Sequence, residues 1–67
     1  MLTERDIYLA ALASIEIHGD AAADRASEQV ERLRKNGSWR RSRAWTRVQV
    51  AILEIQRDAR AGDERLN

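Results

Sequence analysis

The sequence predicts an all-α domain, and three observations lead to this class. The 67 residues contain no proline, while alanine, arginine, glutamate and leucine, which all favour helices, are common. Apolar residues recur every three or four positions, and no segment shows the alternation typical of a strand. Gly19 and Gly37 each follow an apolar helical pattern, and glycine commonly ends a helix. The predicted helices cover about residues 3–18, 20–35 and 39–61.

The first predicted helix begins at Thr3, whose hydroxyl can accept a hydrogen bond from a free amide of the first turn. Asp6, three residues later, completes a capping box with a shorter acid than the usual glutamate. The helix is expected to continue to about His18. Gly19 can then adopt the left-handed conformation that closes a helix.

The second predicted helix is capped by Asp20 and continues to about Lys35, where basic residues favour the negative end of the helix dipole. Asn36-Gly37 predicts a tight turn. Both connections are short, so consecutive helices are expected to pack antiparallel. The sequence therefore predicts one domain, residues 1–67, folded as a three-helix up-down-up bundle.

The third predicted helix starts from either Ser38 or Ser42, since each serine can cap a helix. It is expected to end near Ala61, ahead of Gly62. The remaining residues, 63–67, are expected to form a frayed tail.

One apolar stripe on each helix predicts the core, because positions 100° apart along a helix place these residues on one face. The stripes comprise Ile7, Tyr8, Ala11, Leu12 and Ile15 of the first helix, Ala22, Ala26, Val30 and Leu33 of the second, and Ala44, Trp45, Val48, Ala51, Ile52, Ile55 and Ala59 of the third. About ten large side chains, each stabilising the fold by about 1.5–3 kcal/mol when fully buried, oppose an ordering entropy of similar size. The predicted stability margin is therefore small.

Two further apolar sets lie opposite these stripes. The sets are Leu9, Ala13 and Ile17 on the first helix, and Val50 and Leu53 on the third. In a small bundle, the angular spread of side chains could bury most of them. Alternatively, they form the face of a homodimer, or of a complex with another protein, because apolar repeats on two helices indicate a patch. The homodimer is the preferred interpretation, since it would also relieve the small core.

The net charge of +1 conceals a sharp partition along the chain. Residues 1–31 hold seven acids and two arginines, residues 32–47 hold seven basic residues and no acid, and residues 48–67 carry a net charge of −1. Surface potential acts locally, so this partition matters more than the total. The basic segment supplies the candidate patch for an anionic partner, formed by Trp39, Arg40, Arg41, Arg43 and Arg47.

Three interpretations of this basic patch stay open. Its arginines could neutralise phosphates while Trp39 stacks on an unpaired base, and the two helices around the turn resemble a helix-turn-helix in outline. It could instead contact the acidic helices of a second copy, or another acidic protein. It could also be a solvated surface. Trp45 lies on the core stripe, so we expect it to be structural.

Catalysis, a cofactor and a metal are not expected. There is no cysteine, and His18 is the single histidine, predicted to cap the first helix. No phosphate-binding loop or catalytic triad pattern is found, and so small a domain has little room for a pocket. No apolar run approaches the roughly 20 residues that a membrane span needs. The start of the chain does not read as a signal peptide, so a cytoplasmic protein is expected.

The order and spacing of several weak motifs resemble a family of small uncharacterised helical proteins, known mainly from alphaproteobacteria, that forms a domain of unknown function. The motifs are Asp6 before Ala10-Ala11, Ile15 before His18-Gly19, the alanines 22, 23 and 26, and Gly37 eight residues before Trp45, followed by Val48, Ala51-Ile52 and Ile55-Gln56-Arg57. The resemblance covers about residues 3–57 and implies a short helical protein without a known activity. In that family the segment after the turn is usually acidic or neutral. The basic segment 37–43 departs from this pattern, so a function of the patch would belong to this chain alone.

Overall fold

The computed structural model describes the backbone of residues 2–66 and the side chains of residues 2–60. This part of the chain is helical almost throughout, and the predicted all-α class is confirmed. The elements are α1 (Glu4–His18), the 3₁₀ turn η1 (Gly19–Ala21), α2 (Ala22–Lys35) and α3 (Trp39–Leu66).

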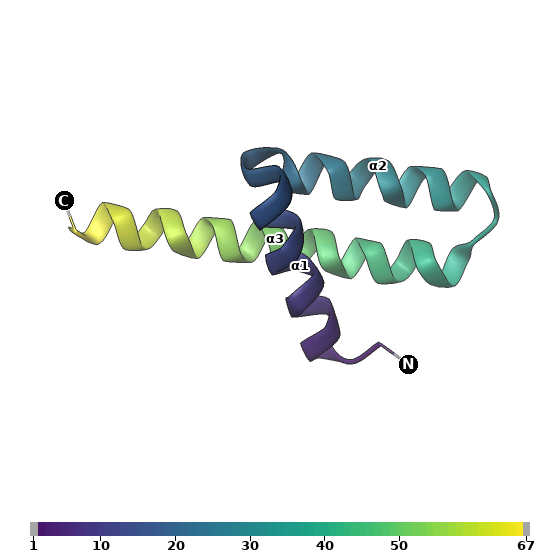
Figure 1. Cartoon of the computed structure of the whole chain (residues 1–67), viewed down its shortest axis with the longest axis horizontal. Helices are drawn as coiled ribbons and strands as arrows, with labels where there is room; N and C mark the ends of the chain where they lie inside the picture. Colours follow the sequence, from purple (N-terminus) through teal and green to yellow (C-terminus); the bar gives the residue numbers. More distant parts are fainter. Residues whose placement is uncertain (1, 67) are drawn as a thin grey trace.

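The predicted up-down-up bundle is wrong in its arrangement. α2 and α3 form an antiparallel hairpin, whereas α1 crosses α3 steeply instead of lying along it (Figure 1). The reason lies in the connection: η1 and Gly19 turn the chain sharply before α2 begins. Small side chains, Ala11 on α1 and Ala22 on α2, are completely buried near the crossing and allow the helices to approach closely.

The start of α1 forms the capping box that the sequence predicts. The backbone N–H of Asp6 donates to Thr3 Oγ1 at 3.2 Å, and the N–H of Thr3 donates to Asp6 Oδ2 at 3.0 Å. The hydrogen bond from the backbone N–H of Thr3, and after it the interaction with the Thr3 side chain, lower the pKa of the Asp6 carboxyl from its ordinary value. The charged carboxylate therefore stabilises this helix end.

The end of α1 differs in detail from the expectation. Gly19 has a positive φ of 56°, but its ψ of −128° lies outside the left-handed helical region. Its N–H still donates to the carbonyl of Ile15. Asp20 belongs to η1 and does not cap α2, because Ala21 occupies the capping position and no side chain bonds there. The predicted cap at Asp20 is wrong, since the additional turn displaces the helix start.

The end of α2 is closed by a Schellman motif around Gly37. The N–H of Gly37 donates to the carbonyl of Arg34 at 3.1 Å, and the N–H of Ser38 donates to the carbonyl of Leu33 at 2.8 Å. Gly37 has a φ of 78°, which suits glycine at this position. The predicted turn is confirmed.

The two serines that could start α3 have different roles. Ser38 directly precedes the helix, and its carbonyl accepts the N–H of Ser42 at 2.9 Å. Ser42 lies inside the helix and is buried, with its hydroxyl 3.4 Å from the carbonyl of Val30 on α2. Ser42 therefore joins the two arms of the hairpin and does not cap α3.

α3 is longer than predicted. Its backbone stays helical through Gly62 as far as Leu66, so the predicted end near Ala61 is wrong and residues 63–66 continue the helix; residue 67 lies outside the described residues. α2 has 14 residues and α3 has 28, so α2 lies beside only the first half of α3 (Figure 1). At the start of the second half, Ile55 packs against the core and Gln56 contacts Gly19 at the end of α1.

The buried core is small and lies where the three helices meet. The buried apolar residues are Ile7, Ala11, Ala22, Ala26, Val30, Val48 and Ile52. All of them belong to the predicted stripes. Tyr8, Leu12 and Ala59 of those stripes are exposed, which corrects the prediction. A crossing α1 buries a narrower strip than a parallel one, and Ala59 lies beyond the end of α2.

Candidate functional site

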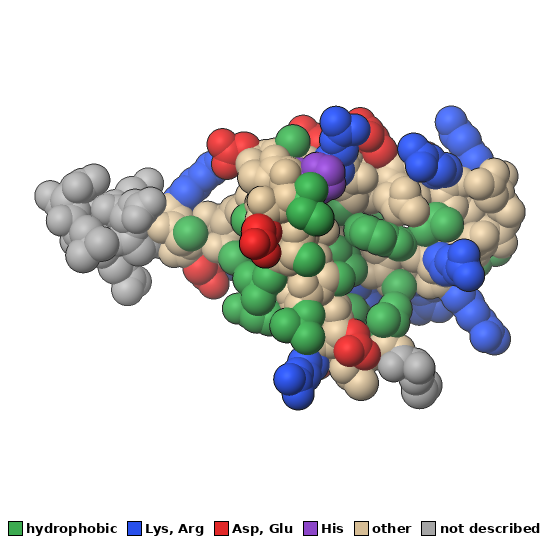
Figure 2. Space-filling view, in the orientation of Figure 1, with side chains coloured by type: hydrophobic (Ala, Val, Ile, Leu, Met, Phe, Trp, Pro, Cys, Tyr) green, Lys and Arg blue, Asp and Glu red, His purple; other side chains and the backbone are tan. Residues whose placement is uncertain are grey.

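The apolar set on α1 lies on the outer surface of the molecule. We call Leu9, Ala13 and Ile17 the outer face of α1; all three are exposed, Leu9 to 51% and Ile17 to 75%. Figure 2 shows hydrophobic side chains over the visible side of α1 and next to it on α3. The opposite side of the helix holds the buried Ile7 and Ala11. α1 is therefore apolar on both sides.

Val50 and Leu53, the α3 pair, are also exposed, to 49% and 52%. They line a groove on α3 together with Arg57 and Arg60. This groove extends along α3 from Val50 into the half of the helix that α2 does not cover (Figure 1). Val50 also lines a second groove of about 330 Å³ between α1 and α3, and Tyr8 lies on its α1 side. The structure thus connects the α3 pair to α1 through Tyr8 and not through Leu9.

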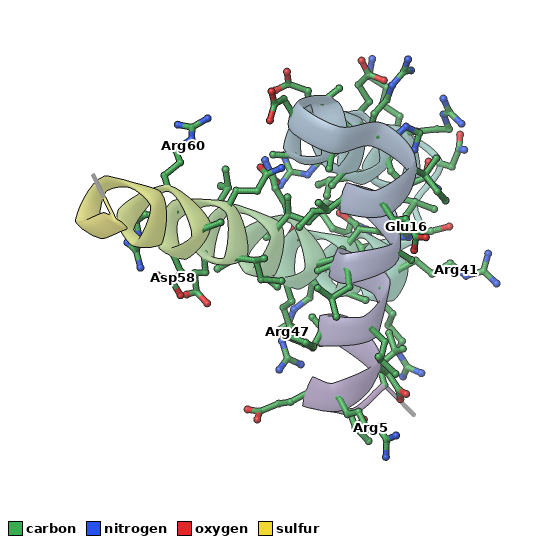
Figure 3. All side chains as sticks on the ribbon, turned by 60° about the vertical axis from the view of Figure 1, so that its left-hand side comes forward. Arg5, Glu16, Arg41, Arg47, Asp58 and Arg60 are labelled. Atoms are coloured by element: carbon green, nitrogen blue, oxygen red, sulfur yellow. The ribbon has the colours of Figure 1, made fainter. Side chains whose placement is uncertain are left out.

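The structure divides the predicted anionic-partner patch. Trp39, Arg43 and Arg47 follow one another at four-residue spacing along α3, and all three are exposed, Trp39 to 61%. Arg40 and Arg41 instead line a groove between α2 and α3. Figure 3 shows the guanidinium groups of Arg41 and Arg47 directed to different sides of the molecule. The four arginines therefore do not form one surface.

Few carboxylates balance these cations. Among the described side chains the ion pairs are Arg25–Glu28 at 3.6 Å and Arg34–Glu31 at 3.7 Å, both on the exposed surface of α2. Such exposed pairs contribute little to stability. No described carboxylate lies within 4 Å of the four arginines of the patch. Lysine and arginine side chains surround the end of the molecule where α2 turns into α3 (Figure 2), so a positive potential is expected there.

Trp45 contributes to a site that the sequence did not predict. It packs against the core, as expected, but it is only half-buried. It lines two grooves of about 310 and 470 Å³, and Gln29 of α2 also lines both. We call these two grooves together the Trp45 groove and refer to them as its smaller and larger parts. Its existence depends on which α2 residues lie opposite Trp45, and the helical spacing of α3 alone gives no signal for that.

Both parts of the Trp45 groove carry positive charge. Arg40 and Arg41 of α3 line the larger part. Arg25 and Arg32 of α2 line the smaller part, together with His18 of α1. Glu28 is the single carboxylate that lines the groove among the described residues, and it pairs with Arg25.

Neither a metal cluster nor a membrane span is found in the described part of the chain. No three histidine, cysteine or acidic side chains described by the structure are placed to share a metal ion. Within the same residues, no helix combines the length and the apolar character needed to cross a bilayer.

Comparison with known proteins finds no matching family model, no matching curated protein and no matching solved structure. The resemblance to the alphaproteobacterial family therefore stays a prediction, and function has to be argued from the surfaces described above.

Proposed function

We propose that this chain is a small, non-catalytic interaction module that associates with a second copy of itself. The observation that supports this proposal best is the exposure of the outer face of α1, above all Ile17 at 75%. A helix on the surface of a globular protein usually has one apolar stripe, which faces the core. α1 has apolar residues on its outer face as well, and the proposed partner surface covers them.

The outer face of α1 is suited to pairing with itself. Leu9, Ala13 and Ile17 are spaced by four residues, and their sizes run large, small, large. A twofold axis at Ala13 would place two antiparallel α1 helices with Leu9 of each copy against Ile17 of the other. The small Ala13 side chains would meet at the axis and allow close approach. An interface built on such an axis is the same patch on both copies.

The α3 pair and Tyr8 supply further exposed apolar area beside α1. A stable interface typically buries about 800 Å² on each partner. The three side chains of the outer face expose only part of that area, so the proposed interface also covers Tyr8, Val50 and Leu53. The small core gives a further reason for association, because Ile52 is the single large side chain that is fully buried among the described residues.

Sedimentation velocity over about a hundredfold range of concentration tests this proposal. We expect a dimer that dissociates on dilution, and a monomer at all concentrations for Leu9→Glu and Ile17→Glu. Leu2→Glu is the matched control, because Leu2 is similarly exposed (56%) but lies outside α1. A wild-type chain that stays monomeric throughout the range would contradict the proposal.

A second candidate function is the binding of nucleic acid by the basic segment 32–47. It is favoured by one observation: Trp39 is exposed next to arginines that have no carboxylate partner among the described residues. Binding of labelled single- and double-stranded oligonucleotides over a salt series tests it. Affinity should fall steeply with salt, because phosphate contacts release counterions. Absence of binding at low salt removes this candidate.

A further inference from the structure

We propose that the Trp45 groove binds one segment of single-stranded nucleic acid, with a base against Trp45 and phosphates on the arginines that line the two parts of the groove. The inference rests on the second candidate function above and gives that function a site. It differs from the sequence-based patch because Trp45, and not the exposed Trp39, is the residue that contacts the base.

The first step of the argument concerns the indole. Trp45 is half-buried and packed against the core, so its orientation is held by the fold, and it also lines both parts of the groove. A fixed aromatic side chain loses little conformational entropy when a base stacks on it. Trp39, exposed to 61% in the first turn of α3, has no such support.

The second step concerns charge. Arg40 and Arg41 line the larger part of the groove and Arg32 lines the smaller part. None of the three has a carboxylate partner within 4 Å among the described side chains. Trp45 lines both parts, and arginines in both parts match a nucleic-acid strand, in which phosphates precede and follow each base. A mononucleotide has phosphate on one side only, and a base inside a duplex cannot reach the indole.

The third step concerns Gln29, which lines both parts of the groove beside Trp45. Its amide can both donate and accept a hydrogen bond, as the edge of a base requires. With three phosphate contacts, the logarithm of the binding constant should fall against the logarithm of salt concentration with a slope of about −2.

Two charge-reversal variants with the same net charge provide the test. Arg40→Glu with Arg41→Glu reverses the charge in the larger part of the groove, whereas Arg43→Glu with Arg47→Glu reverses two charges on the same helix outside the groove. We expect the first variant to lose most of its affinity for a labelled single-stranded oligonucleotide and the second to lose much less. Equal losses of affinity in the two variants would contradict binding in the Trp45 groove but would agree with general binding by the basic segment. Absence of binding by the wild type would overturn both proposals.

Fluorescence locates the base. In Trp39→Phe, Trp45 is the single tryptophan, and oligonucleotide binding should quench its emission. Trp45→Phe should weaken binding about fivefold or more, while Trp39→Phe should leave the affinity almost unchanged. Circular dichroism checks that both variants stay folded. Unchanged Trp45 emission at saturation, or equally tight binding of a mononucleotide or a duplex, would refute the inference.

Discussion

The side-chain amide of Gln56, on α3, donates a 3.0 Å hydrogen bond to the carbonyl of Gly19, at the end of α1. This contact joins residues that are far apart in the sequence and ties the turn between α1 and α2 to the middle of α3. Among the hydrogen bonds of the described residues, this is the one in which a side chain of the hairpin binds the end of the crossing helix α1. Ile7 and Ala11 of α1 are buried in the core and hold the same helix by apolar contacts.

Gln56→Leu should therefore loosen α1 more than the rest of the molecule. We expect a loss of about 1 kcal/mol in the free energy of unfolding, the usual net contribution of one hydrogen bond. Gln49→Leu is the matched control, because Gln49 is the other half-buried glutamine of α3. Chemical denaturation gives the stability, and amide exchange shows whether α1 opens first. Equal effects of the two substitutions would mean that the Gln56 bond has no special role.

Gly19 and Gly37 should respond differently to asparagine. A Cβ atom at either position would meet nothing within 4 Å, so only the backbone conformation opposes a side chain. Gly37 closes a Schellman motif, where asparagine is tolerated, and Gly37→Asn should cost less than 1 kcal/mol. The ψ of −128° at Gly19 lies in a region that glycine alone adopts readily, so Gly19→Asn should cost about 1–3 kcal/mol. Thermal unfolding of the two variants measures the difference.

The capping box predicts a dependence of stability on pH. Hydrogen bonds from Thr3 lower the pKa of Asp6 below its ordinary 3.8, so the carboxylate stabilises the folded state above that pH. This contribution is lost as the pH falls through the lowered pKa of the folded state. Asp6→Asn should therefore be less stable than the wild type at neutral pH, and the two should converge in acid. A stability difference that persists unchanged well below pH 3.8 would contradict this assignment.

Ile52 and Leu53 are neighbours that separate folding from association. Ile52 is completely buried and Leu53 is 52% exposed. Ile52→Val should lower the free energy of unfolding by about 0.5–1.5 kcal/mol. Leu53→Ala should leave the unfolding of the monomer within about 0.5 kcal/mol of the wild type but should weaken the proposed dimer. Denaturation at low protein concentration and sedimentation at high concentration distinguish the two effects.

Much of the fold could be predicted because local rules govern it. Helical spacing identified every buried apolar residue, including Val48 and Ile52, and capping chemistry identified Thr3 and Gly37. The direction of α1 could not be predicted, because it depends on a single ψ angle at Gly19 and on an extra 3₁₀ turn. Neither of these has a clear signal in the sequence.

The surfaces were predicted less well than the core. Exposure of Leu9, Ile17, Val50 and Leu53 follows from helical spacing and agrees with the structure. The division of the basic patch does not follow from charge counting, since Arg40 and Arg41 lie on a different side of α3 from Arg47. The Trp45 groove requires the register between α2 and α3, which depends on packing between residues distant in the sequence.

The unequal lengths of α2 and α3 have a consequence for how the long helix melts. An isolated helix of about 12–15 residues is only marginally stable in water, and the 28-residue α3 continues beyond the 14-residue α2 that supports it. Its far end is therefore stabilised mainly because it extends a helix that is already formed inside the hairpin. Heating should unwind the helix from that end inward, so that one continuous rod loses its amide protection as a gradient and not in a single step.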